Sequence, residues 1–195
     1  MRPAANLNRS AKRRTERGFT LIEVMISAAL ITIGLCSMLA VFGVALAATQ
    51  NAQEDMIAKQ LASEAMESIF TARDTSQLGW NLINNVSNGG IFVDNPQFNP
   101  INNAGADGIV GTGDDAVAGA QTLQLPGQDG IVGTADDPAP LPLTNFQRSI
   151  SITPVVTGGV AAADLRQVII TVQYTTTQFH VPKNYVLTAY ISQYR

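Results

Sequence analysis

Gly18-Phe19-Thr20-Leu21-Ile22-Glu23-Val24-Met25 begins an apolar run that continues to Ala48, and Glu23 is the one charged residue in that run. The run of about 30 residues is longer than the roughly 20 that a helix needs to cross a bilayer. A carboxylate inside such a segment is costly, so it is usually paired or functional. The run follows five basic residues that favour a cytoplasmic flank, namely Arg9, Lys12, Arg13, Arg14 and Arg17. The sequence therefore predicts a single membrane-spanning helix with a purposeful glutamate near its start.

The same stretch carries a resemblance to a known family. A basic leader, the string GFTLIEVM and a long apolar helix resemble the processing site of type IV prepilins and of the pseudopilins of type II secretion systems. The resemblance implies that prepilin peptidase cleaves after Gly18 and methylates the new amine of Phe19. It also makes Glu23 the fifth mature residue, with a role in assembly. The i to i+4 spacing puts the Phe19 amine and the Glu23 carboxylate on one helix face. Their pairing, within a subunit or between neighbours, would offset the desolvation of both charges.

Two other interpretations of the N-terminus are open. Ala45-Leu46-Ala47 has the small-x-small form of a secretory cleavage site, but the preceding apolar region is far longer than the usual 7 to 15 residues. A permanent single-span anchor is the second alternative, and it has no use for Gly18 followed by Glu23. The prepilin interpretation is favoured over both.

Finer features favour a minor pilin of a type IV pilus. Ile33-Gly34-Leu35 and the segment 58–69 resemble PilV-type minor pilins, and Ala40 stands where many major pilins carry a proline. A pseudopilin of a type II secretion system and an adhesive or calcium-binding pilus tip module are the alternatives. The resemblance implies prepilin peptidase, other pilin subunits and the inner-membrane assembly platform as partners. It places the precursor in the inner membrane as a single-pass protein and the assembled subunit in an extracellular or periplasmic filament.

We predict an α+β chain with the pilin fold, in which a long N-terminal helix packs on a small antiparallel β-sheet. The leader is 1–18, the membrane or filament-core helix is 19–48, and the helix continues as an amphipathic segment over 49–73. Apolar residues of that segment share one stripe at helical spacing: Ile57, Leu61, Ala65, Met66, Ile69 and Phe70. Charged residues are predicted to lie mostly off the stripe: Glu54, Asp55, Lys59, Glu64, Glu67 and Arg73.

The rest of the chain is predicted to divide in two. Residues 74–147 are rich in Asn, Gly, Asp and Pro and form a connecting region, with short strands near 90–93 and 121–125. Residues 148–195 carry β-branched and aromatic residues in partial alternation, which predicts strands at 148–156, 165–175 and 184–194.

Composition and charge argue against some classes of function. The leader carries a formal charge of +5 and the chain −3, which leaves −8 for the mature 177 residues. So acidic a domain argues against nonspecific nucleic-acid binding, and we predict no nucleic-acid partner. Cys36 is the only cysteine, so an intrachain disulfide cannot form. His180 is the only histidine and has no catalytic partner set nearby in sequence, and Trp80 is a candidate core anchor. We therefore predict that the protein is not an enzyme.

A nine-residue repeat is the second notable feature. Residues 107–115, Asp-Gly-Ile-Val-Gly-Thr-Gly-Asp-Asp, return as residues 129–137 with eight of nine positions identical. Hard carboxylate oxygens on a bent loop suit calcium. The candidate metal ligands are Asp107, Asp114, Asp115, Asp129, Asp136 and Asp137. The alternative is that both copies form solvated turns and tuck their Ile-Val pairs, 109–110 and 131–132, inward.

Overall fold

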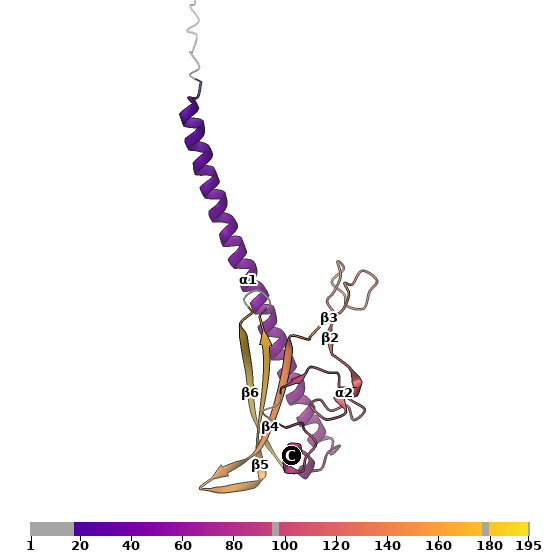
Figure 1. Cartoon of the computed structure of the whole chain (residues 1–195). Coiled ribbons are helices and arrows are strands. Elements are labelled where there is room, and N and C mark those ends of the chain that lie inside the picture. The colour runs from indigo at the N-terminus through magenta and orange to yellow at the C-terminus, as the bar shows by residue number, and fades with distance from the viewer. Residues whose placement is uncertain (1–17, 95–97, 177–179, 195) are drawn as a thin grey trace, which may run out of the picture. The chain divides into compact units, whose positions relative to one another are not determined.

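The structure, a computed structural model, describes residues 18–94, 98–176 and 180–194, so the predicted basic leader up to Arg17 lies outside the described residues. The chain divides into two units, Met1–Leu46 and Ala47–Arg195. Its elements in chain order are α1 (Leu21–Asp74), η1 (Trp80–Leu82), η2 (Val86–Asn88), β1 (Asn99–Pro100), α2 (Asp115–Ala118), β2 (Thr122–Leu123), β3 (Leu141–Pro142), β4 (Phe146–Thr157), β5 (Val160–Thr175) and β6 (Pro182–Ser192). The predicted α+β class, a long N-terminal helix with an antiparallel sheet, is confirmed (Figure 1).

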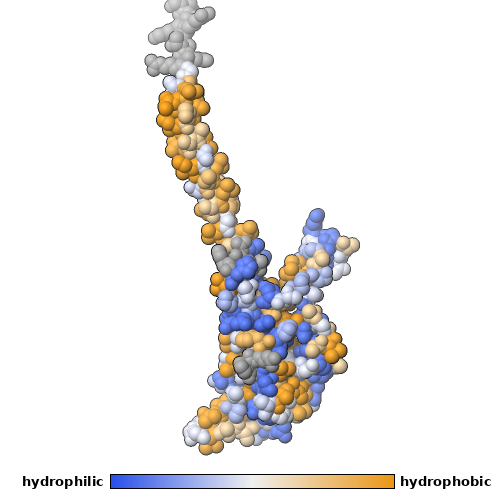
Figure 2. Space-filling model, in the orientation of Figure 1, coloured by the Kyte–Doolittle hydropathy of each residue, from blue (hydrophilic) through white to orange (hydrophobic). Residues whose placement is uncertain are grey.

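The part of α1 that belongs to the first unit is apolar and fully uncovered. Every residue from 18 to 46 is exposed, and Val44 and Leu39 expose 72% and 69% of their surface. The visible face of this segment is accordingly mostly apolar (Figure 2). Among the described residues, α1 is the one helix whose length and composition would let it cross a membrane. An apolar surface of this size needs a lipid environment or neighbouring helices to cover it.

The part of α1 in the second unit is amphipathic and provides one wall of the core. Each of the following buried apolar residues has another three or four positions away, as one face of a helix requires: Ala58, Leu61, Ala62, Ala65, Met66, Ile69 and Ala72. The prediction that Glu54 lies off this stripe is wrong, since Glu54 is only 8% exposed. The physical reason is its position one helical turn before Ala58, which places both residues on the same face.

The sheet provides the opposite wall of that core. Its strand order is β1-β4-β5-β6, all neighbours are antiparallel, and the long strands lie alongside the second part of α1 (Figure 1). One face of the two central strands is almost fully buried through Ile150, Ile152, Val168, Ile170 and Val172. The strands predicted at 148–156, 165–175 and 184–194 correspond to β4, β5 and β6, and the core follows from their two-residue alternation. The short strand predicted near 121–125 corresponds to β2, but the one predicted near 90–93 is wrong, because Phe92 makes only isolated bridges there.

The connecting region 74–147 is attached to the sheet by a buried side chain. β1 pairs with β4 over two residues only. Beyond it, Asn85 donates a hydrogen bond to the carbonyl of Ile150 at 2.9 Å and accepts one from the backbone N–H of Ile152 at 2.7 Å. Asn85 is 5% exposed. Its amide therefore replaces a strand neighbour and satisfies backbone groups that would otherwise be buried without partners.

The single tryptophan and the single histidine of the chain lie in different surroundings. Trp80 packs against the core, donates a hydrogen bond from Nε1 to the carbonyl of Ala163 at 2.7 Å and lies under the guanidinium of Arg166 at 4.3 Å. His180 is exposed and has a positive φ of 52°. Trp80 thus acts as a packing anchor, and His180 lies exposed between the end of β5 and the start of β6.

Candidate functional site

The predicted processing site lies directly before α1. Gly18 and Phe19 precede the first helical residue, Leu21, and Phe19 is 81% exposed. A side chain added at Gly18 would meet no atom within 4 Å. The peptide bond after Gly18 is therefore open to a protease within the described part of the chain.

Thr20 and Glu23 form the start of the helix. The backbone N–H of Glu23 donates to the Thr20 hydroxyl at 3.3 Å and to the Thr20 carbonyl at 3.1 Å. Thr20-x-x-Glu23 matches the capping-box pattern, in which a threonine hydroxyl satisfies a free N–H of the first turn. The Glu23 side chain lies in this first turn, where the helix dipole favours a negative charge. The capping role of Thr20 was not predicted, although the spacing of Thr20 and Glu23 in the sequence matches the capping box.

The first copy of the repeat is a loop tied by its own carboxylates. Asp107 accepts a hydrogen bond from the N–H of Ile109 at 2.8 Å. Asp115 accepts from Gly105 at 3.0 Å and from Gly111 at 2.6 Å, so the folded unit begins two residues before the sequence repeat. These bonds bend the chain into a closed turn with its Ile-Val pair on one side.

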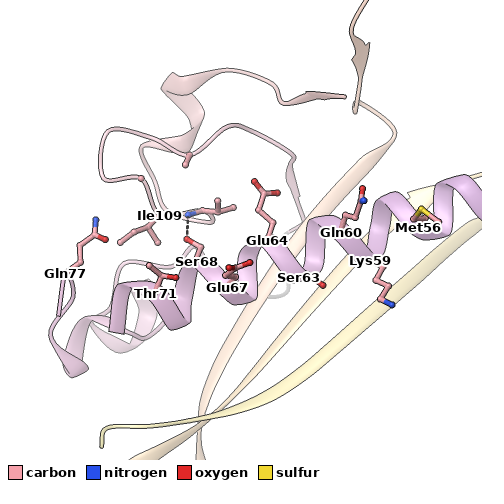
Figure 3. A pocket seen from close by; sticks show the side chains of 13 residues that line it. Met56, Lys59, Gln60, Ser63, Glu64, Glu67, Ser68, Thr71, Gln77 and Ile109 are labelled. Carbon is pink, nitrogen blue, oxygen red and sulfur yellow. Dashed lines mark hydrogen bonds between the residues drawn. The ribbon is translucent and has the colours of Figure 1, made fainter. Parts of the chain in front are cut away.

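That pair is buried against α1. Ile109 and Val110 are 1% and 4% exposed, and both belong to the core cluster. The N–H of Val110 donates to the Ser68 hydroxyl at 3.0 Å, which fixes the loop to the helix (Figure 3). The expectation that the first pair tucks inward is thus correct.

The second copy has the same internal fold in a different setting. Asp129 accepts from Ile131 at 2.8 Å, and Asp137 accepts from Gly127 at 2.8 Å and from Gly133 at 2.5 Å. This loop ends an arm whose base is the two-stranded β2-β3 pair, and the arm extends away from the sheet (Figure 1). Ile131 and Val132 are 61% and 54% exposed. The expectation that this pair tucks inward is wrong, because the arm carries it away from the core.

The second loop also brings its three aspartates together. One carboxylate oxygen from each of Asp129, Asp136 and Asp137 lies within 4.8 Å of the others, a spacing that could hold a metal ion. The hydroxyl of Thr134 donates to Asp136 at 2.7 Å, and this bond, followed by the one from the Asp129 N–H, lowers the pKa of Asp136. Ionised oxygens at this spacing are suitable calcium ligands. Backbone donors, however, already use most of them.

The first loop lies near a buried arginine, Arg148, that was not predicted from the sequence. Arg148 is 5% exposed, donates to the carbonyl of Leu61 at 3.3 Å and lies 3.9 Å from Glu64. Burial lowers the pKa of Arg148, while the charges of Glu64 and Asp115 act to raise it. Its burial could have been predicted from the two-residue alternation of β4, because Arg148 lies on the inward face between Phe146 and Ile150.

Asp115 itself is 6% exposed. Burial raises the pKa of its carboxyl above the usual value, although hydrogen bonds from Gly111 and Gly105 and the charge of Arg148 oppose that rise. Its counterpart Asp137 accepts the equivalent bonds from Gly133 and Gly127 and a further one from the Thr134 N–H. The pKa of Asp137 is lowered: burial acts to raise it, but these bonds outweigh that effect.

A groove runs between α1 and the first loop (Figure 3). Its volume is about 780 Å³, and it is lined by Met56, Lys59, Gln60, Ser63, Glu64, Glu67, Ser68, Thr71, Gln77, Ala104, Gly108, Ile109 and Val110. The helix contributes hydroxyl, amide and charged side chains to it. The described residues of the lining include no histidine or cysteine.

Comparison with known proteins adds to this geometry at the N-terminus. The family description "Prokaryotic N-terminal methylation motif" matches residues 13–35. No curated protein and no solved structure is significantly similar to the chain. The matched segment contains Gly18, Phe19 and Glu23 together with the first turns of α1. The methylation motif, at the start of a long helix that continues against an antiparallel sheet, indicates a protein of the type IV pilin-like family.

Proposed function

We propose that the protein is a minor pilin of a type IV pilus that prepilin peptidase cleaves after Gly18. The observation that carries the proposal is the methylation motif joined to a helix whose apolar part, 21–46, is exposed throughout. Such a surface suits the membrane before assembly and packing with other subunits afterwards.

Assembly would use the first turn of α1. After cleavage, the methylated Phe19 amine and the Glu23 carboxylate would lie on one helix face. Glu23 would pair with the Phe19 amine of its own or a neighbouring subunit, which offsets the desolvation of both groups. The capping bond between Thr20 and the Glu23 N–H supports this role, because it fixes the backbone from which the carboxylate projects.

The motif implies processing by prepilin peptidase and assembly with other pilin subunits, and with α1 it is consistent with a membrane-anchored precursor. We further propose a single-pass precursor in the inner membrane that engages the assembly platform and leaves as part of an extracellular filament. PilV-type minor pilins remain the proposed subtype.

Two other functions are proposed as alternatives. A pseudopilin of a type II secretion system would share the motif and the exposed helix, and its filament would remain periplasmic. Labelling of filaments on intact cells with an antibody to the globular unit separates it from a pilus subunit. A calcium-binding pilus tip module is supported by the convergence of Asp129, Asp136 and Asp137. It predicts that attachment is lost, while filaments remain, when these aspartates become asparagine.

The decisive experiment is mass spectrometry of the N-terminus of the membrane-extracted protein from cells with and without prepilin peptidase. We expect a chain that begins at methylated Phe19 only when the peptidase is present. Glu23→Ala should keep the same mature N-terminus and reduce recovery in filaments. A chain that begins at Ala48 or at Met1 in both strains would overturn the proposal.

A further inference from the structure

The second repeat exposes an apolar Ile-Val pair that the first repeat buries. Ile131 and Val132 lie side by side in sequence and are 61% and 54% exposed. Their counterparts, Ile109 and Val110, are 1% and 4% exposed. The first copy covers this pair by packing it against the rest of the fold, so the second copy presents an apolar surface that is available for a partner to cover.

The loop that carries the pair is already folded. Its tight turns are the same as those of the buried copy, with φ values of 73° and 94° at Gly130 and Gly133 against 70° and 92° at Gly108 and Gly111. The Thr134 hydroxyl bonds to the Ile131 carbonyl at 3.2 Å, as Thr112 bonds to Ile109 at 3.2 Å. Binding would therefore require little ordering of the loop, and a preformed element loses less conformational entropy on association.

The buried copy shows which kind of surface such a loop fits. Its apolar pair enters a depression formed with α1, and Val110 donates its N–H to the Ser68 hydroxyl. A buried cation, Arg148, acts on its Asp115 carboxylate. Val132, the counterpart of Val110, has no protein acceptor for its N–H among the described residues. A fitting surface offers an apolar depression, a hydroxyl or carbonyl acceptor and a nearby arginine or lysine.

A second copy of this chain fits poorly. Its equivalent depression is filled by its own first repeat, and its mature charge is −8, which disfavours a loop that brings three more carboxylates. We propose that the second repeat, residues 127–137, is a docking element for a different pilin-like subunit that offers this kind of surface. The inference rests on the proposed function, since it names a partner within the same filament.

Site-specific photo-crosslinking in the full chain tests the inference. A benzophenone amino acid replaces Val132 in one strain and Val117 in a control strain, because Val117 is 90% exposed in the same unit but lies outside the repeat. Sheared filaments are irradiated, and crosslinked products are identified by mass spectrometry. We expect Val132 to crosslink to another subunit with a prepilin motif and Val117 to give no such product.

A substitution gives an independent readout. The double variant Ile131→Asp/Val132→Asp should reduce the share of the chain recovered in filaments by about tenfold, as loss of a central interface contact does, while Val117→Asp should leave it unchanged. Both variants should keep the parent's melting temperature, because all three side chains are exposed in the subunit.

Three results would overturn the inference. Filaments that contain the chain but give equal crosslinking at both positions would remove the docking role and leave the proposed function intact. Crosslinks to a second copy of this chain, or to a protein without the motif, would show that the partner is wrong. A chain with an unprocessed N-terminus that never enters filaments would remove the proposed function and the inference with it.

Discussion

The two copies of the repeat have the same fold and opposite environments. Residues 107–115 press their apolar pair into the core, and residues 129–137 hold theirs in solvent. Most of the internal hydrogen bonds correspond, with distances that agree closely, such as 2.8 Å for both Asp107–Ile109 and Asp129–Ile131. The second loop adds a bond from the Thr134 N–H to Asp137 at 3.1 Å. The loop conformation is therefore local, because the Asp and Thr side chains bind their own backbone. Whether the apolar pair is buried therefore depends on residues outside the loop.

The flanking residues offer a physical reason for the difference. Ala104 and Ala116 border the folded loop of the first copy, whereas Pro126 and Pro138 border that of the second. Proline fixes φ and cannot donate a backbone hydrogen bond, so it favours extended, stiff connections. The first copy continues directly into α2, and the second is held on the β2-β3 arm.

Truncation of the equivalent isoleucines should separate the copies most clearly. Ile109→Ala removes a fully buried side chain and should lower the free energy of unfolding by about 2–5 kcal/mol. Ile131→Ala should change it by no more than about 0.5 kcal/mol, as at other exposed sites. Urea titration followed by the fluorescence of Trp80, the single tryptophan, measures both. Equal losses would mean that the second loop is also buried.

The paired glycines give a sharper comparison of the same kind. Gly111 and Gly133 have φ values of 92° and 94°, so alanine strains both by about 1–2 kcal/mol. At Gly111 the added carbon would also come within 2.2 Å of Ile150 Cδ1, while at Gly133 it meets nothing within 4 Å.

Gly111→Ala should therefore cost about 1–3 kcal/mol more than Gly133→Ala, because only the first overpacks the core. The same urea titration measures the difference between the two variants. If both lose equal stability, backbone strain explains the whole effect and the packing argument fails.

The sequence predicted the long helix, the strands and the processing motif because each depends on short-range patterns. Apolar spacing defined the core face of α1, and two-residue alternation defined β4, β5 and β6. The prediction for Glu54 was wrong because it followed from the charge of the side chain and not from the position of the residue on that helix face. A carboxylate can occupy a buried face when the surrounding fold supplies partners, which spacing alone does not reveal.

The repeat was predicted less well because its two copies are nearly identical in sequence. Identical residues predict identical burial, and that was wrong for Ile131 and Val132. Asn85 and Arg148 escaped notice for a related reason, since their partners lie more than 60 residues away along the chain. Single polar residues in loops and strands carry no periodic signal, and their roles depend on tertiary contacts.

Calcium provides a third way to distinguish the copies. If the second loop binds calcium with a dissociation constant of about 1 mM, as extracellular modules do, about 10 mM calcium should stabilise the fold by about 1.4 kcal/mol. Isothermal calorimetry and thermal unfolding of the soluble part, 49–195, measure binding and stabilisation. Asp136→Asn should abolish both, and Asp114→Asn in the buried copy should abolish neither. The absence of calcium heat together with an unchanged melting temperature would refute the metal hypothesis.

The smallest expected difference is in pH dependence, and the equivalent aspartates should respond in opposite directions. The folded-state pKa of Asp115 is raised, so its contribution to stability is present below the unfolded pKa of about 3.9 and is lost as pH rises through the higher folded value. The folded-state pKa of Asp137 is lowered, so its contribution is present above that pH and is lost as pH falls through the lower folded value.

Urea titrations of the parent, Asp115→Asn and Asp137→Asn between about pH 3 and pH 7 should show this. The parent should lose stability relative to Asp115→Asn as pH rises, and relative to Asp137→Asn as pH falls. Each asparagine also lacks one carboxylate oxygen, but that loss is largely independent of pH, so the slopes carry the result. Slopes of the same sign would show that the two carboxylates share one environment. Opposite slopes would show that burial outweighs the hydrogen bonds at Asp115, whereas the hydrogen bonds outweigh burial at Asp137.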